Sequence, residues 1–510
     1  LNTKIMWKDK GKMKFSIITL GCKVNTYESQ YYAAQLEELG YEQVSPDQAC
    51  DICIINTCTV TNLSDRKSRQ RIRRVKKQNE DAVVVVTGCY AQTDADAVAK
   101  IPGVSVIAGT NEKAHIVEFV EEYMQMHKNV QIEQRRTDRT EESKEEKDEV
   151  SESKDVGLQI DSYIRTERDT DAGPDIHVLP YEELREYEET GSITSMESRT
   201  RAYIKIQEGC DRFCSYCIIP YARGRVRSRD IREIVKEAEG LVQAGFKEIV
   251  LTGINTALYG RDFSEEVNGL SGVEIAVDAI SRIEGDFRIR LSSLEPNVVD
   301  EETARRLTKY PKLCPHMHLS LQSGSDTVLK RMNRRYDTET YRRITEVFKA
   351  FDSNFAVTTD IIVGFPGETE AEFEESLSTI RQIGFSKVHA FKYSKRRGTK
   401  AAKMPDQIDG KVKAQRMDRM IRLAEKIAEN FFARNTGTIR RVLFERYDPQ
   451  TSMLMGLTDN YIHTYCRMGK DEADQYVNRF ADVQLGELYQ DGLTGVLVEK
   501  TGQRADQAPE

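Results

Sequence analysis

Short apolar runs alternate with amphipathic stretches in two separate parts of this chain of 510 residues. In the first part the apolar runs are Phe15–Leu20, Asp51–Asn56, Val83–Thr87 and Val104–Ala108. Nearly continuous apolar strands with helices between them are typical of a parallel sheet that is covered on both faces. We therefore predict a doubly wound α/β domain over residues 13–130.

The same alternation returns over residues 199–434, where six strand-like runs predict a partial (β/α)6 barrel of the TIM type. Residues 435–500 hold short β-like runs separated by glycine turns. This pattern is compatible with a small five-stranded barrel of the oligonucleotide-binding type, with one strand left unplaced. The expected architecture is thus α/β, with a doubly wound domain, a larger barrel and a small terminal β-barrel.

An acidic segment, residues 131–198, separates the two α/β parts. Residues 141–197 within it carry a net charge of about −13, so the rest of the chain is mildly basic although the whole carries −8. Few apolar residues recur at a regular period there, and such a composition buries too little surface to offset the entropy of ordering. We expect a disordered linker or a loosely packed insertion, with at most one short helix over residues 181–187, and the alternative is an electrostatic mimic of RNA.

Three cysteines lie close together directly after the first strand-like run of the larger barrel. These are Cys210, Cys214 and Cys217, which we call the barrel triplet. A structural zinc site needs four filled positions, and iron–sulfur clusters normally take four thiolates as well. Three thiolates on a cluster of four irons leave one iron open for an exchangeable ligand. A zinc knuckle or a redox pair is the alternative interpretation.

A second set of cysteines follows the predicted strands of the first domain. Cys22, Cys58 and Cys89, which we call the sheet triplet, each come directly after a strand. Open parallel sheets place their sites at the carboxyl ends of the strands, so we expect these thiols to converge and hold a second cluster. Cys50 and Cys53 do not fit this pattern, and we interpret both as structural.

The order of these domains and several motifs resemble the radical S-adenosylmethionine methylthiotransferase family over nearly the whole chain. The matching motifs are residues 206–217, 220–229, 292–296, 321–325 and 360–369. Asn255, Ala257 and Lys392 depart from the family pattern.

The segment around Cys22 points to one branch of that family. Its sequence Gly-Cys-Lys-Val-Asn resembles the branch that acts on N6-threonylcarbamoyladenosine at tRNA position 37. The branch that modifies isopentenyladenosine typically has Gly-Cys-Gln-Met-Asn there, and the branch that modifies a ribosomal protein aspartate has Gly-Cys-Pro-Lys-Asn. Both remain alternatives.

The resemblance implies two [4Fe–4S] clusters, one on each triplet, and S-adenosylmethionine as cofactors. One molecule of S-adenosylmethionine would be cleaved to a 5′-deoxyadenosyl radical that takes hydrogen from C2 of the adenine. A second would provide the methyl group of the transferred methylthio group. Beyond the cluster ligands no catalytic residue is implied. The residues implied to bind S-adenosylmethionine are Tyr216, Gly253, Glu295 and Gln322, with Glu295 the candidate for its ribose.

Basic side chains in three places favour the anticodon stem-loop of tRNA as a partner, because phosphate contacts provide affinity for RNA. The candidates are Arg69, Arg73, Arg225, Arg227 and Arg440, the last on a barrel that the resemblance identifies as TRAM-like. We expect flavodoxin or ferredoxin as reductant, and a monomer. No apolar run is long enough to span a membrane, and the cysteine usage indicates a reducing, cytoplasmic compartment. An iron–sulfur electron carrier and an RNA-binding module with structural zinc are the alternatives outside enzymes.

Overall fold

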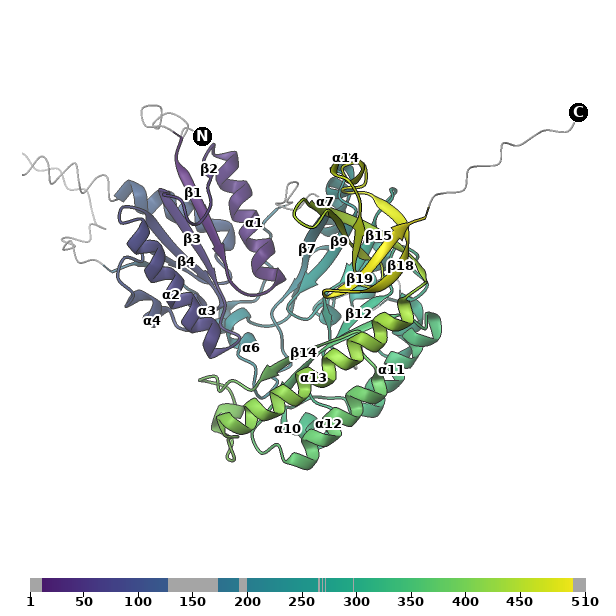
Figure 1. The fold of residues 1–510 in the computed structure, drawn as a ribbon. Helices are drawn as coiled ribbons and strands as arrows, with labels where there is room; N and C mark the ends of the chain where they lie inside the picture. The colour runs from purple at the N-terminus through teal and green to yellow at the C-terminus, as the bar shows by residue number, and fades with distance from the viewer. Residues whose placement is uncertain are drawn as a thin grey trace, which may run out of the picture. The chain divides into compact units, whose positions relative to one another are not determined.

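The computed structural model describes residues 12–126, 173–191 and 200–498, apart from positions 265, 266, 268, 271 and 297 (Figure 1). The chain packs as two compact units. Unit 1 holds the first strand, Tyr32–Cys58 and Leu63–Leu179. Unit 2 holds the chain from Pro180 onward together with two short earlier segments, Gly21–Tyr31 and Thr59–Asn62.

Unit 1 is built on a six-stranded parallel sheet with the order β2-β1-β3-β4-β5-β6. The strands are β1 Lys14–Thr19, β2 Glu42–Gln43, β3 Ile52–Thr57, β4 Val83–Gly88, β5 Val106–Ala108 and β6 Asp175–His177. Every residue of β3 is buried, as expected for a central strand covered on both faces. The carboxyl ends of β1, β3 and β4 are in register, with Thr19 opposite Asn56 and Thr57 opposite Gly88.

The helices of this region are α1 Lys23–Glu38, α2 Asn62–Gln78, α3 Cys89–Thr93 and α4 Ala95–Ala99, followed by a short 3₁₀ turn, Lys113–His115, and a helix described over residues 116–126. Helix α2 buries only Ser68, Ile72 and Val75, which lie four and three residues apart on one face. The parallel sheet with these helices confirms the predicted α/β class. Helix α1 begins five residues earlier than the predicted start at Glu28, directly after Cys22.

Strand β6 lies inside residues 131–198, where the sequence predicted a disordered or loosely packed segment, and it pairs with β5 through Ile107 and Ile176. A short 3₁₀ helix, Tyr181–Glu183, follows it within the stretch where one short helix was expected. The ring of His177 stacks on Phe119 at 3.7 Å between centroids. A three-residue strand is stabilised by its neighbours and not by its own composition, so a compositional argument does not detect it. Residues 131–172 and 192–198 of the predicted linker lie outside the described residues.

Unit 2 contains the predicted partial barrel in two four-stranded sheets, β10-β9-β7-β8 and β11-β12-β13-β14. The strands are β7 Arg201–Glu208, β8 Arg227–Ser228, β9 Glu248–Gly253, β10 Arg288–Leu291, β11 Ser293–Leu294, β12 His316–Leu319, β13 Ala356–Val363 and β14 Lys387–Lys392. Strand β10 runs on into β11 with one residue between them. All strand pairs are parallel except β7 with β8.

The helices of the barrel are α6 Ile219–Arg223, α7 Ile231–Gln243, α8 Val273–Ser281, α9 Glu301–Leu307, α10 Asp326–Arg331, α11 Thr338–Phe351, α12 Glu370–Ile383 and α13 Gly410–Asn435. Helix α12 begins where it does because Thr369 and Glu372 form a capping box. Apolar side chains of these helices and of the strands form one continuous core.

The end of the chain forms a closed five-stranded barrel with the order β15-β16-β17-β19-β18. Its strands are β15 Ile439–Asp448, β16 Met453–Thr458, β17 His463–Arg467, β18 Phe480–Tyr489 and β19 Gly492–Leu497, with a short helix α14 Lys470–Ala473. The strand that the sequence left unplaced is β18. Arg288 and Arg290 of β10 donate hydrogen bonds to the carbonyls of Leu457 and Thr458, which holds this barrel against the larger one.

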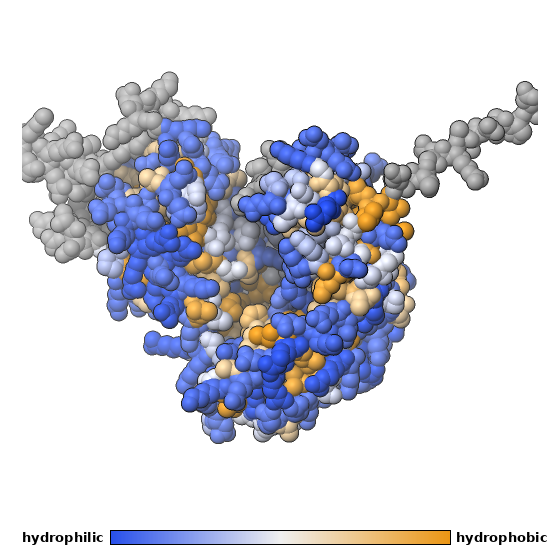
Figure 2. Space-filling view, in the orientation of Figure 1, coloured by the Kyte–Doolittle hydropathy of each residue, from blue (hydrophilic) through white to orange (hydrophobic). Residues whose placement is uncertain are grey.

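Most of the visible surface is hydrophilic, with apolar surface interspersed beside α13 and β14 (Figure 2). There a groove of about 390 Å³ is lined by Phe391, Met417 and Ile421 among others. No helix in the described part of the chain has both the length and the apolar character that crossing a bilayer requires.

Candidate cofactor sites

The barrel triplet lies on one loop that follows β7. The loop opens at Gly209, whose φ is +71° and whose added Cβ would lie 1.6 Å from the Arg225 carbonyl oxygen, so only glycine fits. The amide of Cys210 donates to the Gly224 carbonyl at 3.0 Å, and the amide of Cys217 donates to the Cys214 carbonyl at 2.9 Å. These bonds fold the loop back on itself.

Segments that come later in the larger barrel form further hydrogen bonds with this loop. The Ser215 amide donates to the Met332 carbonyl at 2.9 Å, and the Ser215 carbonyl accepts from the Ala401 amide at 2.7 Å. The side-chain amide of Asn333 donates to the Phe213 carbonyl at 3.1 Å. The loop is therefore fixed by backbone bonds that no single stretch of sequence contains.

The chemistry of the three thiols fits an iron–sulfur group. Burial raises the pKa of Cys210 to about 12 and raises the pKa of Cys217 as well. A thiol in such surroundings keeps its proton unless a metal cation replaces it. Arg334 Nη1 donates to Cys214 Sγ at 3.4 Å, which suits a sulfur that carries negative charge. Within the described residues, no three His, Cys, Asp or Glu side chains are gathered closely enough for a single metal ion.

Glu295, one of the predicted binding residues, lies next to this loop and is 3% exposed. Its carboxylate accepts from Arg212 Nε at 2.9 Å, from Asn255 Nδ2 at 2.8 Å and from Arg334 Nη1 at 3.4 Å. Sequence reasoning missed Arg212 and Arg334, although Arg212 lies within the triplet motif. Asn255 had been noted only as a departure from the family pattern. The role of Glu295 in binding a ribose stays a prediction.

The other three predicted binding residues come from separate strand ends and loops. Gly253 ends β9, and an added Cβ there would lie 2.9 Å from the Gln207 carbonyl oxygen. Tyr216 packs edge-on against Phe365 with 6.5 Å between ring centroids, and burial raises its pKa. Gln322 has a φ of +69°, and both its backbone amide and its backbone carbonyl form hydrogen bonds with β13. Their contacts with a cofactor remain predictions.

Two members of the sheet triplet follow neighbouring strands of unit 1. Cys58 comes directly after β3 and Cys89 directly after β4, and both are buried. Gly88 has a φ of +92°, and an added Cβ would lie 2.5 Å from the Thr57 carbonyl oxygen, so the turn before Cys89 requires glycine. The paired strand ends present these two cysteines from the same edge of the sheet, which suits a shared ligand.

Cys22, the third member, is exposed and belongs to the segment that packs in unit 2. Its Sγ lies 3.5 Å from Asn25 Oδ1. None of the ten cysteines, all of which the structure describes, forms a disulfide, so the thiol donors of both triplets are in the chemical form that a cluster needs. The convergence of Cys22 with Cys58 and Cys89 stays a prediction.

Cys50 and Cys53 form a separate pair at the opposite end of β3. Their sulfurs lie 2.6 Å apart, and Ser16 Oγ is 3.3 Å from each. The bond from Cys53 lowers the pKa of Cys50 to about 7. Our interpretation of both as structural residues is not tested by these contacts.

The five arginines that we predicted as RNA contacts differ in exposure. Arg73 and Arg225 are exposed, and Arg69 donates to the Tyr90 hydroxyl at 3.0 Å. Arg440 is largely buried and pairs with Asp352 at 2.9 Å. Arg227 is 1% exposed and so offers no surface to a phosphate, contrary to our prediction. Its guanidinium points inward instead, where it donates to the Arg223 carbonyl at 2.8 Å and to the Glu186 carbonyl at 3.2 Å.

Comparisons with known proteins agree with this geometry. The model of the radical SAM superfamily matches residues 204–380, and that of the uncharacterized protein family UPF0004 matches residues 14–109. The threonylcarbamoyladenosine tRNA methylthiotransferase MtaB of Bacillus subtilis is 38% identical over 94% of this chain and 96% of its own length. Its namesake from Thermotoga maritima is 34% identical over 94% and 95%.

More distant relatives include the tRNA-2-methylthio-N(6)-dimethylallyladenosine synthase of Caldicellulosiruptor saccharolyticus, which is 31% identical over 98% of this chain and 95% of its own length. Among solved structures, the radical S-adenosylmethionine methyltransferase TsrM from Kitasatospora setae superposes with a TM-score of 0.50. It shares 14% sequence identity over 75% of each chain, so the similarity concerns the fold.

Proposed function

The chain belongs to the radical S-adenosylmethionine methylthiotransferase family, and we propose that it transfers a methylthio group to C2 of N6-threonylcarbamoyladenosine at position 37 of tRNA. The observation that carries this proposal is the 38% identity to a threonylcarbamoyladenosine tRNA methylthiotransferase over 94% of the chain. The sequence similarity to this relative extends over both units, so it includes the barrel triplet in one unit and Cys58 and Cys89 in the other.

The barrel triplet would hold one [4Fe–4S] cluster, and Cys22, Cys58 and Cys89 would hold a second. When bound, these groups and S-adenosylmethionine supply the electron, the radical and the sulfur that amino-acid side chains cannot provide. The contribution of the chain is to orient them. Arg334 donates to Cys214 and to Glu295, so it links the cluster loop to the carboxylate proposed to bind the ribose.

The proposed reaction consumes two molecules of S-adenosylmethionine, one as methyl donor and one as source of the radical. A low-potential reductant such as flavodoxin or ferredoxin would supply the electron, and the chain would act as a monomer. These finer points follow from the family and not from the fold.

Helix α2 supports tRNA as the substrate. Its solvent side carries a run of basic side chains, whereas its inner face buries only small and aliphatic residues. The exposed basic residues are Arg66, Lys67, Arg71, Arg73, Arg74 and Lys77. Such a face releases counterions when it contacts a phosphate backbone. The helix begins four residues after Cys58, so RNA bound to this face would lie near one member of the sheet triplet.

Lys23 favours the threonylcarbamoyl substrate over isopentenyladenosine. Burial together with the charges of Arg290 and Arg201 lowers the pKa of its ammonium group to about 8. Arg201 and Arg290 already pair with the buried Glu248, whereas a carboxylate placed beside Lys23 would favour the charged form of its ammonium group. The threonylcarbamoyl group carries a carboxylate at neutral pH, whereas the isopentenyl group is an uncharged hydrocarbon. Lys23 is also at one of the two positions after Cys22 that differ between the branches.

Replacing Lys23 by glutamine should therefore weaken the use of threonylcarbamoyl substrate. We expect kcat/KM for an anticodon stem-loop that carries this group to fall about 10- to 100-fold, the effect of losing one charge-assisted hydrogen bond. The Lys23→Arg variant keeps the charge and should retain most of the activity. Equal kcat/KM for the glutamine variant and the unaltered enzyme would remove Lys23 from substrate recognition.

Analysis of modified nucleosides tests the proposed function itself. The chain is expressed in a bacterial strain that lacks its own threonylcarbamoyladenosine methylthiotransferase, and tRNA nucleosides are measured by mass spectrometry. We expect the 2-methylthio derivative of N6-threonylcarbamoyladenosine to appear, with no change in isopentenyladenosine. Appearance of methylthiolated isopentenyladenosine alone would assign the chain to the other branch.

A further inference from the structure

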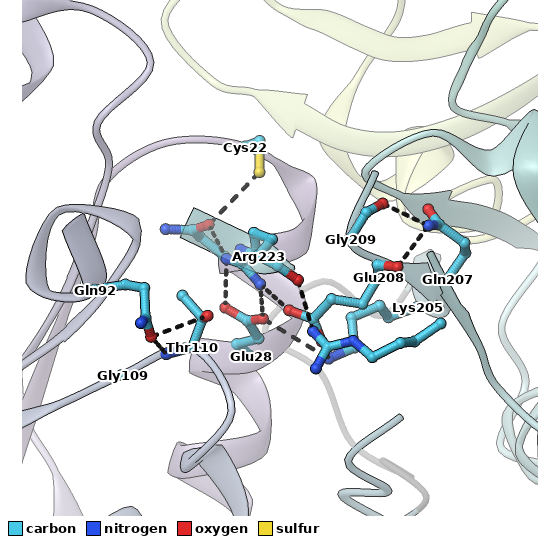
Figure 3. Close-up of polar contacts among 12 residues, drawn as sticks. Cys22, Glu28, Gln92, Gly109, Thr110, Lys205, Gln207, Glu208, Gly209 and Arg223 are labelled. Atoms are coloured by element: carbon cyan, nitrogen blue, oxygen red, sulfur yellow. Dashed lines mark hydrogen bonds and ion pairs between the residues drawn. The ribbon is translucent and has the colours of Figure 1, made fainter. Parts of the chain in front are cut away.

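A buried network of ion pairs connects the segment Gly21–Tyr31 to the loop of the barrel triplet (Figure 3). At its centre is Arg223, the last residue of α6, whose side chain is 0% exposed. Its Nη1 donates at 2.5 Å both to Glu28 and to Glu208. Its Nη2 donates to Glu28 at 3.1 Å and to Asn25 at 3.0 Å. One guanidinium thus joins helix α1 to the end of β7.

On the α1 side, the network reaches the sheet triplet. Asn25 Oδ1, which accepts from Arg223, also lies 3.5 Å from the Sγ of Cys22. Cys22 directly precedes the helix and Asn25 lies in its first turn. A guanidinium that holds this turn therefore also holds the cysteine before it.

On the barrel side, Arg223 acts through its side chain and through the neighbouring backbone. Glu208 ends β7 two residues before Cys210. The carbonyl of Gly224, the residue after Arg223, accepts the hydrogen bond from the Cys210 amide. The side chain of Gln207 donates to the Gly209 carbonyl at 2.7 Å. Movement of Arg223 would therefore disturb Cys210 both through its ion pair with Glu208 and through the Gly224 carbonyl.

Two further cations complete the network. Lys205 Nζ lies 3.2 Å from the Glu208 carboxylate and 3.7 Å from that of Glu28, and Arg227 approaches Glu208 at 4.0 Å. Each of these side chains is at most 1% exposed. Separating a buried charge from its ion-pair partner costs a large free energy. The network therefore resists movement of the segment Gly21–Tyr31 relative to the loop of the barrel triplet.

We propose that Arg223 is a positioning residue that sets the place of Cys22 relative to the barrel triplet. This rests on the proposed function, in which Cys22 helps to hold the sulfur-donating cluster and the barrel triplet holds the radical-forming one. The radical formed at one site is useful only if the methylthio group is delivered to the same carbon. A misplacement of about 1 Å costs on the order of 100-fold in comparable reactions.

The shape of arginine explains why another cation cannot replace it. The planar guanidinium reaches Asn25, Glu28 and Glu208 at the same time. A lysine ammonium is a compact point charge and cannot span these three acceptors. The Arg223→Lys variant therefore keeps the buried charge but releases at least one of the two segments.

The test compares Arg223→Lys with Arg416→Lys. Arg416 is a matched control because it is also buried in unit 2 and bonds to the Glu368 carboxylate at 2.8 Å, on helix α13. The first measurement is amide hydrogen exchange of the cluster-free full chain. We expect exchange over residues 21–31 to rise at least about tenfold in Arg223→Lys, as expected for a locally released segment, and to stay unchanged in Arg416→Lys.

The second measurement uses the reconstituted enzyme. The ratio of methylthio product to 5′-deoxyadenosine formed should fall about tenfold or more in Arg223→Lys, because radicals are then spent without sulfur transfer. Iron content should equal that of the unaltered enzyme. If Arg223→Lys does not fold, Asn25→Leu replaces it, since this change leaves both ion pairs of Arg223 intact.

Unchanged exchange over residues 21–31 would overturn the proposal whatever the activity. An unchanged product ratio, despite faster exchange, would also overturn it, because the network would then be merely structural. If the unaltered enzyme forms no methylthio product, the proposed function fails. The exchange measurement then still decides whether Arg223 holds Cys22.

Discussion

Replacing Cys214 by alanine should reduce the cleavage of S-adenosylmethionine to the background of protein without iron. The barrel triplet supplies only three thiolates, so the loss of one leaves too few ligands to hold a cluster with an open iron. The variant also removes the sulfur to which Arg334 Nη1 donates, which leaves a buried cation with one partner fewer. The measurement is 5′-deoxyadenosine formed by the reduced protein, together with iron content.

Cys466→Ala provides the matched control. Cys466 is buried in the terminal barrel and belongs to neither triplet. Its replacement should cost about 1 kcal/mol of unfolding free energy, typical of a small cavity, and should leave cleavage intact. If Cys214→Ala cleaved S-adenosylmethionine as fast as Cys466→Ala, the barrel triplet would not be the radical-forming site.

The strands that were predicted correctly are those whose apolar residues run continuously. Every residue of β3 is buried, so its sequence alone indicates a central strand. Strand β18 was missed because only Val483 and Leu485 of its ten residues are buried, so the apolar–polar alternation typical of a half-buried strand is too short to identify it. Its place comes from closure of the barrel, since it pairs with β15 and β19, and pairing across the barrel leaves no local signal.

The start of α1 was missed for a related reason. Its buried face carries polar residues, since Tyr27 bonds to Glu237 and Glu28 pairs with Arg223. Amphipathic patterns detect helices that bury apolar residues, and they fail where the buried residues are ionic. The partners lie about 200 positions away in the chain, so only the folded structure reveals them.

The same limit applies to the candidate sites. The cysteines could be found from the sequence because their spacing is local or because each follows a predicted strand. The four arginines Arg223, Arg225, Arg227 and Arg229 look equivalent in the sequence, as a basic run that would face RNA. In the structure Arg225 is exposed and the other three are buried in ion pairs. Charge alone does not tell a surface patch from an internal network.

Replacing Cys89 by alanine should abolish methylthiolation of tRNA and leave the cleavage of S-adenosylmethionine intact. Cys89 follows β4 in unit 1, whereas the three proposed ligands of the radical-forming cluster lie on one loop of unit 2. Loss of Cys89 would therefore remove a ligand of the proposed sulfur-donating cluster only. The readouts are the methylthio nucleoside and 5′-deoxyadenosine from the same reaction, with iron content as an independent measure.

Cys53→Ala separates this effect from simple damage to the sheet. Cys53 is buried in β3, the strand next to Cys89, and a small cavity there should cost about 1 kcal/mol as well. Cys53→Ala should form product and 5′-deoxyadenosine in the normal ratio. If Cys89→Ala still modified tRNA at the normal rate, the second cluster would have no basis. If it lost both activities while Cys53→Ala kept both, the sheet triplet would be needed for radical formation and the two sites would not be separate.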